Sequence, residues 1–269
     1  MRRILLAAVM LGAAAGAQAA DVPDLPILRG AFTGGPAAAT VDWQGYYIGG
    51  QWGYGSSDEN FGRSPSPNPL LMGLLAERGI SGWPTLNLGK VSHRSSGGGA
   101  FAGYNSQWED VVVGVEASYL HGGFGGSDSN SFNRFQALAD GNNHDITSIS
   151  RAFIDINDML TLRIRGAYQC AFFLPYLFGG VALGNADIGR SATLTDNIYS
   201  PLGLFLGSVT RTAQEIQHSH LIYGYSAGLG VDMMLYHGLF ARAEWEYVRF
   251  TSSVDTSINT VRLGLGYKF

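Results

Sequence analysis

The chain has 269 residues, and only 14% of them are charged, whereas a typical soluble domain has about 25%. Its net charge of −4 is only mildly acidic, which argues against nucleic acid or anionic lipid surfaces as partners. Glycine (38 residues), tyrosine (13) and phenylalanine (14) are abundant, and no long apolar run follows the first 20 residues, so the composition favours a lipid-facing β-sheet over membrane-spanning helices.

The first 19 residues have the pattern of an export signal. Arg2 and Arg3 precede an apolar run over residues 4–15, and Ala17-Gln18-Ala19 fits the small-x-small rule for signal cleavage. Cleavage after Ala19 would leave 15 basic and 21 acidic residues, a net charge of −6. Residues 20–42 contain three prolines and are predicted to form a periplasmic lead-in, followed by one domain over residues 43–269.

The chain contains one cysteine, Cys170. A disulfide within the chain is therefore excluded, and no Cys/His spacing predicts a zinc site. The stability of the exported protein must come from another source, such as a closed barrel in which every strand is paired on both sides.

Eight segments alternate between apolar residues and polar or glycine residues, the pattern of strands with two different faces. In the last segment Val261, Leu263 and Leu265 share one face, and the chain stops on an aromatic residue within it. The predicted strands cover residues 44–56, 97–107, 111–121, 156–170, 175–187, 218–233, 239–250 and 258–269.

The connections between these segments alternate in length. Residues 57–96, 122–154 and 188–217 are predicted as long irregular loops, the first with a short helix over 70–76, while the connections at 108–110, 171–174 and 235–238 are short. Long loops on one side and short turns on the other are typical of outer-membrane barrels. We therefore predict an all-β fold, an eight-stranded antiparallel up-and-down transmembrane β-barrel with both termini in the periplasm.

Aromatic residues on the lipid-facing parity gather near both ends of the predicted strands, as in the two aromatic girdles of membrane barrels. Tyr46, Tyr104, Tyr168 and Phe269 fall toward the periplasmic ends, and Trp52, Tyr54, Tyr119 and Tyr223 toward the outer ends. A soluble β-sandwich would not need both groups on the same face.

The sequence resembles that of a known group of barrels. Its motifs are WQGYYIGGQWGYG (43–55), VVVGVEA (111–117), LRIRGAY (162–168), LPYLFGGVALG (174–184), GYSAGLGVD (224–232), AEWEYVRF (243–250) and VRLGLGYKF (261–269). Together they resemble the small alphaproteobacterial outer-membrane proteins called outer-membrane immunogenic proteins or porin-family surface antigens, which are OmpA-like eight-stranded barrels.

The resemblance implies a place in the outer membrane of a Gram-negative cell and a structural or surface-antigen role without a defined substrate. It also implies two partners: outer-membrane lipid and the barrel-insertion machinery, which would read Phe269 as a C-terminal signal. The first loop is longer than the group leads us to expect, so roles carried by loops are not transferred.

Most charges within the predicted strands fall on the lumen-facing parity, because a Lys or Arg facing lipid at mid-membrane costs about 2–4 kcal/mol. The predicted lumen set is Glu116, Arg163, Arg165, Asp232, Arg242, Glu244, Glu246, Arg262 and Lys268. This set could filter ions, or it could form salt bridges that plug a narrow barrel; we favour the plug because eight strands leave little free bore. Glu244 and Glu246 resemble a catalytic carboxylate pair, but neighbouring arginines would keep both ionised.

The chain has six histidines, and His218-Ser219-His220 would place two imidazoles on one strand face as half of a metal or haem site. No spacing supplies a third ligand, and no Ser–His–acid arrangement is visible, so we expect neither cofactor nor enzymatic activity. The predicted function is a structural or surface-antigen role. The alternatives are a small pore for ions or solutes and loop-mediated binding of host surface, haem or metal, for which His93, His218 and His220 would be tested.

Overall fold

The computed structural model describes residues 41–62, 65–251 and 254–269. The predicted export signal lies outside the described residues, as does the lead-in except for Val41 and Asp42. Among the helices of this described part, none is long and apolar enough to cross a membrane.

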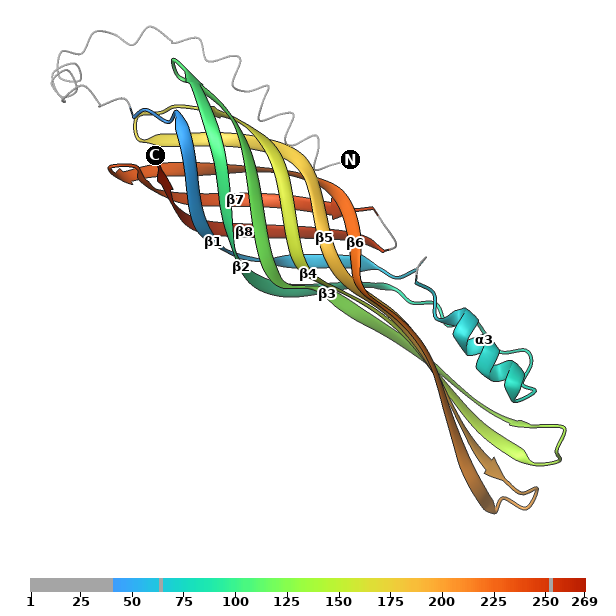
Figure 1. The fold of residues 1–269 in the computed structure, drawn as a ribbon. Helices are drawn as coiled ribbons and strands as arrows, with labels where there is room; N and C mark the ends of the chain where they lie inside the picture. The colour runs from blue at the N-terminus through green and yellow to red at the C-terminus, as the bar shows by residue number, and fades with distance from the viewer. Residues whose placement is uncertain (1–40, 63–64, 252–253) are drawn as a thin grey trace, which may run out of the picture. The chain divides into compact units, whose positions relative to one another are not determined.

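Eight strands form a closed antiparallel barrel in which β1 pairs with both β2 and β8 (Figure 1). The predicted strand number and up-and-down order are confirmed. The strands are β1 (Gly45–Asn60), β2 (Lys90–Trp108), β3 (Val111–Ala137), β4 (Asn143–Tyr168), β5 (Phe173–Tyr199), β6 (Phe205–Tyr236), β7 (Leu239–Phe250) and β8 (Asp255–Lys268).

The prediction of irregular loops over 122–154 and 188–217 is wrong, because β3 to β6 continue through both segments as paired strands. Glycine, serine, asparagine and aspartate there indicated loops, but these residues lie on strands beyond the barrel, where one face is solvated. Ile146, Ala152, Ile154 and Ile156 are buried and lie an even number of residues apart along β4. The alternation of a strand was therefore present in the sequence, but the polar composition of the segment favoured the prediction of a loop. The start predicted for the second strand was also late, since β2 begins at Lys90.

The parts of β3 to β6 beyond the barrel form an extended sheet, comprising residues 124–137, 143–156, 188–199 and 205–217 (Figure 1). Register irregularities mark its base on adjacent strands, at His121–Phe124, Ile156–Asp158 and Ala186–Ile188. An extra residue in a strand bends the sheet and increases its twist. This row of bulges lies where the extended sheet leaves the barrel.

Loop 1 comprises residues 61–89, and its described residues, 61–62 and 65–89, pack against one face of the extended sheet. Its helix α3 (Asn68–Glu77), predicted over 70–76, buries Leu71, Leu74 and Leu75 in a cluster that includes Ile146 of β4 and residues of β5. Trp83 adds a hydrogen bond from its indole Nε1 to the Ser148 hydroxyl at 2.9 Å. The insertion therefore gives the extended sheet an apolar core of its own.

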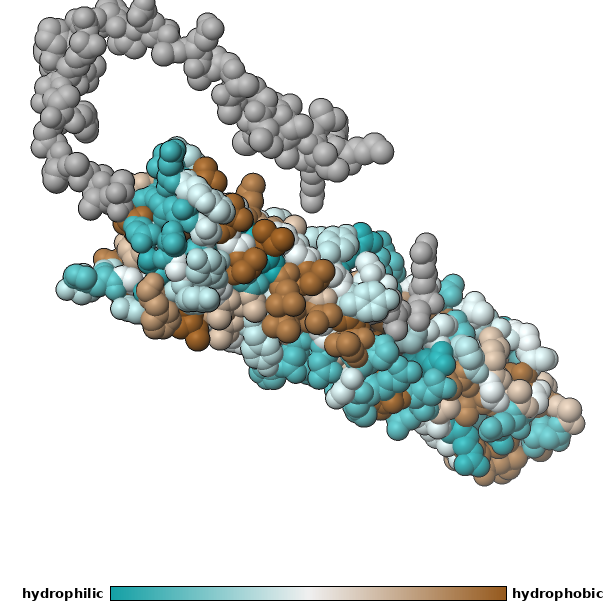
Figure 2. Space-filling model, turned by 45° about the horizontal axis from the view of Figure 1, so that its top comes forward, coloured by the Kyte–Doolittle hydropathy of each residue, from teal (hydrophilic) through white to brown (hydrophobic). Residues whose placement is uncertain are grey.

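The outer surface of the barrel is apolar where all eight strands are paired, and Figure 2 shows hydrophobic residues gathered over this region. Ile48, Val115, Ile164 and Leu177 are between 52% and 68% exposed, too much for side chains surrounded only by water. Aromatic residues of both predicted girdles lie on this surface, among them Tyr46 near one end and Tyr223 near the other.

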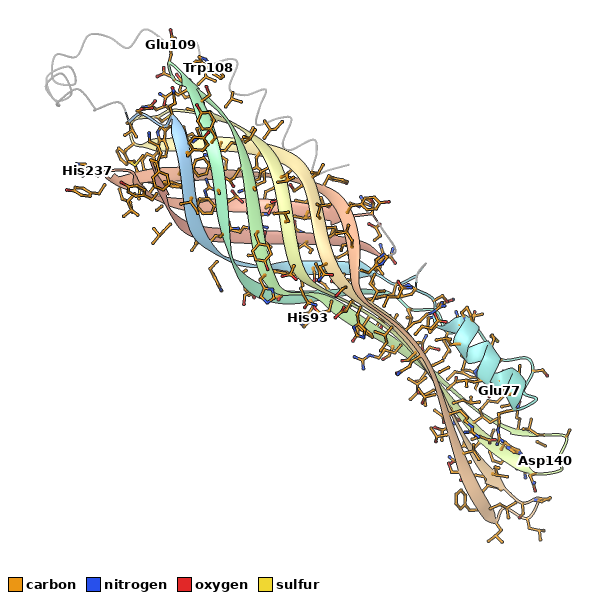
Figure 3. The ribbon with its side chains drawn as sticks, viewed as in Figure 1. Glu77, His93, Trp108, Glu109, Asp140 and His237 are labelled. Atoms are coloured by element: carbon orange, nitrogen blue, oxygen red, sulfur yellow. The ribbon has the colours of Figure 1, made fainter. Side chains whose placement is uncertain are left out.

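Three short turns close the end of the barrel away from the extended sheet. They contain Glu109, Ala171 and His237, each with a positive φ between 39° and 54°. Figure 3 shows Glu109 and His237 at this end and Asp140, in the β3–β4 tip, at the opposite end. We call these the turn end and the extension end.

Candidate functional site: a charged layer inside the barrel

Eight ionisable side chains meet in the barrel interior and are each at most 4% exposed. Four are arginines and four are acids, so their formal charges cancel. This charged layer consists of Glu116, Arg163, Arg165, Asp232, Arg242, Glu244, Glu246 and Arg262.

Strand alternation brings these side chains together. Arg163 and Arg165 lie two residues apart on β4 and therefore point to the same side, as do Arg242, Glu244 and Glu246 on β7. The outward residues between them are apolar or small, so one face of each strand meets lipid and the other supplies charge to the interior.

Glu116 is the most connected acid of the charged layer. It accepts hydrogen bonds from the Tyr47 hydroxyl at 2.7 Å and from Arg242 Nη1 at 2.8 Å. Arg165 Nη1 donates to the same carboxylate at 3.2 Å, and Arg163 donates to its other oxygen. Strands β1, β3, β4 and β7 thus converge on one carboxylate across the bore.

Asp232 is held by two arginines. Arg242 donates through Nε at 2.8 Å and through Nη2 at 3.0 Å, a forked arrangement that fixes the orientation of the guanidinium. Arg165 Nη2 donates to the same carboxylate at 2.7 Å. The two arginines therefore bridge Asp232 to Glu116.

The remaining two acids extend the charged layer across the lumen. Arg163 forms a bidentate pair with Glu244, with both N···O distances at 2.7 Å, and the Tyr176 hydroxyl donates to Glu244 at 2.9 Å. Glu246 pairs with Arg262.

Aromatic rings cover the guanidinium planes. Arg163 lies 4.1 Å from the ring centroid of Phe178, Arg165 lies 3.9 Å from Tyr176, and Arg242 lies 3.9 Å from Phe101. Cation–π contacts of this kind are strongest where water is excluded. The rings therefore stabilise the arginine charges on the faces that carboxylates cannot reach.

Apolar clusters fill the interior on both sides of the charged layer. The turn-side cluster contains Trp43, Tyr47, Phe101, Val112, Ala167, Leu174, Tyr176, Phe178 and Phe240. The extension-side cluster contains Phe61, Leu88, Leu120, Phe124, Ala152, Ile154, Ile156, Met159, Ala182, Ala186, Ile188, Ile222, Val248, Phe250, Val254 and Ile258. The lumen is therefore packed with side chains at three successive levels.

Two residues of the predicted site lie apart from the charged layer. Lys268 is at the turn end, where its Nζ donates to the Gln44 carbonyl at 2.6 Å. Phe269 is 72% exposed, and its backbone N–H donates to the Tyr46 carbonyl at 2.9 Å. Neither side chain contributes to the interior pairs.

Sequence reasoning missed the two tyrosines that donate to the acids, Tyr47 and Tyr176. Their inward parity was visible, but the strand register that aligns them with Glu116 and Glu244 was not. A second signal was the glycines on adjacent strands. A Cβ on Gly103 would lie 2.4 Å from the Tyr47 oxygen, and one on Gly230 would lie 2.6 Å from the Tyr176 ring, so these glycines leave the space that each ring occupies.

The expected histidine pair is not formed, because a bulge separates the two residues. Ser219 has φ 54°, and residues 218 and 219 together oppose Asp187. His218 Nδ1 lies 3.5 Å from Asp187, whereas His220 lies opposite Ala186, whose side chain faces the interior. The imidazoles therefore fall on opposite faces, and within the described residues no group of three His, Cys, Asp or Glu side chains could hold a metal.

A smaller polar cluster fastens the extended sheet to loop 1. Asp196 is buried and pairs with Arg78 of loop 1 and with His144 Nδ1, at 2.8 Å from the latter. The other ring nitrogen of His144 contacts Asp140 at 3.1 Å. Hydrogen bonds from the backbone N–H and side-chain amide of Asn142 hold the pKa of Asp140 below its ordinary value of 3.8.

A protein-family model described as outer membrane protein beta-barrel domain matches residues 4–269 of the chain. The chain belongs to this family. It is also similar to the 25 kDa outer-membrane immunogenic protein of Brucella ovis, with 25% identity over 191 residues that cover 70% of this chain and 72% of the relative.

Two solved structures are also similar to this family member. Ail, the attachment invasion locus protein of Yersinia pestis, is 13% identical with a TM-score of 0.34, covering 84% of this chain and 99% of that one. The Neisserial surface protein A is 12% identical with a TM-score of 0.33, covering 83% and 97%.

As an outer-membrane barrel of a Gram-negative cell, the protein has a structural or surface role. Its apolar band lies in membrane lipid. Barrels of this kind carry short turns on the periplasmic side and longer connections outside. From this rule we propose that the turn end is periplasmic and that the extended sheet with loop 1 lies outside the cell.

Proposed function

We propose that the protein is a closed, non-conducting and non-enzymatic barrel that anchors the extended sheet and loop 1 at the cell surface. The observation that carries this proposal is the three-level filling of the lumen, with a charge-neutral layer between two apolar clusters. In this proposal the eight charged residues act as a structural plug. The immunogenic relative supports a surface-antigen role for the part that projects outward.

The pore alternative requires a water-filled path through the barrel. Large aromatic and aliphatic side chains fill the interior above and below the charged layer, and every acid in that layer is paired with arginine. A neutral, paired layer offers a passing ion no unpaired charge to exchange with. These contacts support the plug over the filter.

The single cysteine allows a test of how the barrel is oriented in the outer membrane and of whether the extended sheet is exposed at the cell surface. Cys170 is exposed in the β4–β5 turn. A membrane-impermeant maleimide should label it only after the outer membrane is opened. In the variant Cys170→Ser with Ser208→Cys, which moves the thiol to an exposed position on the extended sheet, labelling should occur on intact cells. Labelling of Cys170 on intact cells, together with no labelling of Ser208→Cys until the outer membrane is opened, would overturn the proposed surface exposure of the extended sheet.

We also propose that Phe269 serves as the signal read by the barrel-insertion machinery, and that residues 1–19 direct export. Phe269 is exposed at the turn end beside Tyr267, with ring centroids 5.4 Å apart. Phe269→Ala should lower the amount of heat-modifiable barrel in outer-membrane fractions. Phe172→Ala, which removes another exposed aromatic side chain at the same end, is the control and should leave assembly unchanged.

A further inference from the structure

The β5–β6 hairpin ends at the far end of the extended sheet (Figure 1). The side chains at its tip are apolar and exposed. Leu202 is 96% exposed, Leu204 68%, Phe205 55% and Leu206 54%. Phe135 of β3 is 61% exposed and lies 6.3 Å from Tyr199, which lies 5.6 Å from Phe205, measured between ring centroids. We call these six side chains the apolar tip.

The turn itself is held by hydrogen bonds. The Ser200 N–H donates to the Leu204 carbonyl at 2.8 Å, and the Gly203 N–H donates to the Ser200 carbonyl at 2.9 Å. The Ser200 hydroxyl accepts from the Leu204 N–H at 3.1 Å, and Gly203 adopts φ +83°. The exposure of Leu202 at the apex therefore follows from a defined turn.

No charged residue or histidine occurs from Asn197 to Thr210, a run of 14 residues in the sequence. Asp196, which precedes it, is buried and paired with Arg78, and Arg211 follows it. The whole segment lies beyond the barrel and its lipid-facing band, where the exposure of apolar side chains to water is unfavourable. The β5–β6 part of the apolar tip thus carries no charge, and among the described residues no element covers it.

We propose that the apolar tip inserts into the phospholipid bilayer of a second membrane facing the cell. The barrel occupies the cell's own outer membrane, and the tip projects from the opposite end to the periplasmic turns. Apolar side chains enter the boundary between head groups and acyl chains to a depth of about 5–10 Å. The Tyr199 hydroxyl at the base of the tip suits the head-group level, where aromatic residues with a polar atom are enriched.

The size and form of the tip favour a bilayer over a protein partner. A specific protein interface takes about 20–30 residues from each side, and the apolar tip offers six side chains, on the turn and on the strands beside it. A fluid bilayer needs no complementary surface. Because the segment is uncharged, zwitterionic lipid should suffice and added salt should not weaken binding.

The test uses the full chain folded in phosphatidylcholine nanodiscs and mixed with separate phosphatidylcholine liposomes. Wild-type nanodiscs should float with the liposomes at low and at high salt. The variant Leu202→Ser/Leu204→Ser/Phe205→Ser should reduce the bound fraction at least tenfold while keeping the heat-modifiable barrel. The control Ile149→Ser/Ile216→Ser, which changes two exposed apolar residues of the extended sheet outside the apolar tip, should bind like wild type.

A second measurement follows the tip directly. In Cys170→Ser with Leu202→Cys, an environment-sensitive fluorophore on the new thiol should shift to shorter wavelength with liposomes and be quenched by lipids brominated on their acyl chains. Absence of flotation, an unchanged spectrum, or equal binding by the triple-serine variant would overturn the proposal. Pairing of protein-loaded nanodiscs with one another but not with empty phosphatidylcholine nanodiscs, lost in the triple-serine variant, would also overturn it, because the tip would then contact a second copy of the chain rather than lipid.

Discussion

Glu116 is the residue on which the charged layer depends most, since three arginines and Tyr47 converge on its carboxylate. Glu116→Gln keeps the shape but leaves the layer with one uncompensated positive charge. Breaking a buried pair in this way costs about 3–5 kcal/mol. We expect the free energy of unfolding, measured in urea with the barrel in lipid vesicles, to fall by that amount.

The matched control is Glu215→Gln. Glu215 pairs with Arg190 at 2.7 Å, but its side chain is 56% exposed. An exposed pair contributes about 0–1 kcal/mol. Equal losses in the two variants would contradict the structural role given to the charged layer.

His237 has a strained backbone, because it adopts a positive φ of 39° in the turn before Gly238. Asparagine tolerates the left-handed region better than histidine, and Asn-Gly is the favoured pair in two-residue hairpins. His237→Asn should therefore raise the free energy of unfolding by about 0.5 kcal/mol. Denaturant unfolding beside His237→Val, which should lower the free energy, checks the sign.

For single residues, the sequence predicted which face of a strand each charged side chain takes, but it did not predict which residue that side chain pairs with. Alternation on β4 and β7 was enough to turn Arg163 and Glu244 inward. The pairing of Glu116 with Arg242 joins residues 126 positions apart, and it depends on strand tilt and register around the whole barrel. No local pattern contains that information.

Among the elements, α3 is the one whose packing can be tested without disturbing the barrel. Leu71 and Leu75 are buried against the extended sheet, whereas Met72 on the same helix is 36% exposed. Leu71→Ala/Leu75→Ala should release loop 1, since each buried leucine contributes about 2–5 kcal/mol. Trypsin should then cut at Arg78 on intact cells many times faster.

Met72→Ala is the control for this experiment and should leave the cleavage rate near that of wild type. Both variants should keep the band shift on heating, because the barrel strands are unchanged. Rapid cleavage of the wild type at Arg78 would show that loop 1 is not held against the sheet.

The strands were predicted well where their outward residues contact lipid, because lipid contact requires the alternation of apolar and polar residues. The bounds of β7 agree with the predicted segment, because its outward residues from Leu239 to Tyr247 are apolar, aromatic or small, and the one outward charge, Arg249, lies near the end of the strand. Beyond the membrane this constraint ends, and β3 to β6 carry serine, asparagine and aspartate on their solvated faces. Composition then indicated loops, although Ile146, Ile154 and Ile156 kept the alternation of a strand.

For the whole molecule, the filled lumen predicts that the purified protein gives no channel events in planar bilayers. The double variant Arg163→Ala/Glu244→Ala should also stay silent, because it removes one pair, keeps the net charge and leaves both apolar clusters in place. A large porin reconstituted in the same way controls for insertion. Steady ion-selective events from the wild type would restore the pore hypothesis.

The distribution of charge along the chain has a consequence for how the barrel closes. Strands β1 to β4 contribute one acid and two arginines to the charged layer, a surplus of one positive charge. Strands β5 to β8 contribute three acids and two arginines, a surplus of one negative charge. Each half would hold uncompensated charge beside lipid, and only the joined halves are neutral. Electrostatics thus disfavours a half-assembled barrel and favours completion of the ring when β8 meets β1.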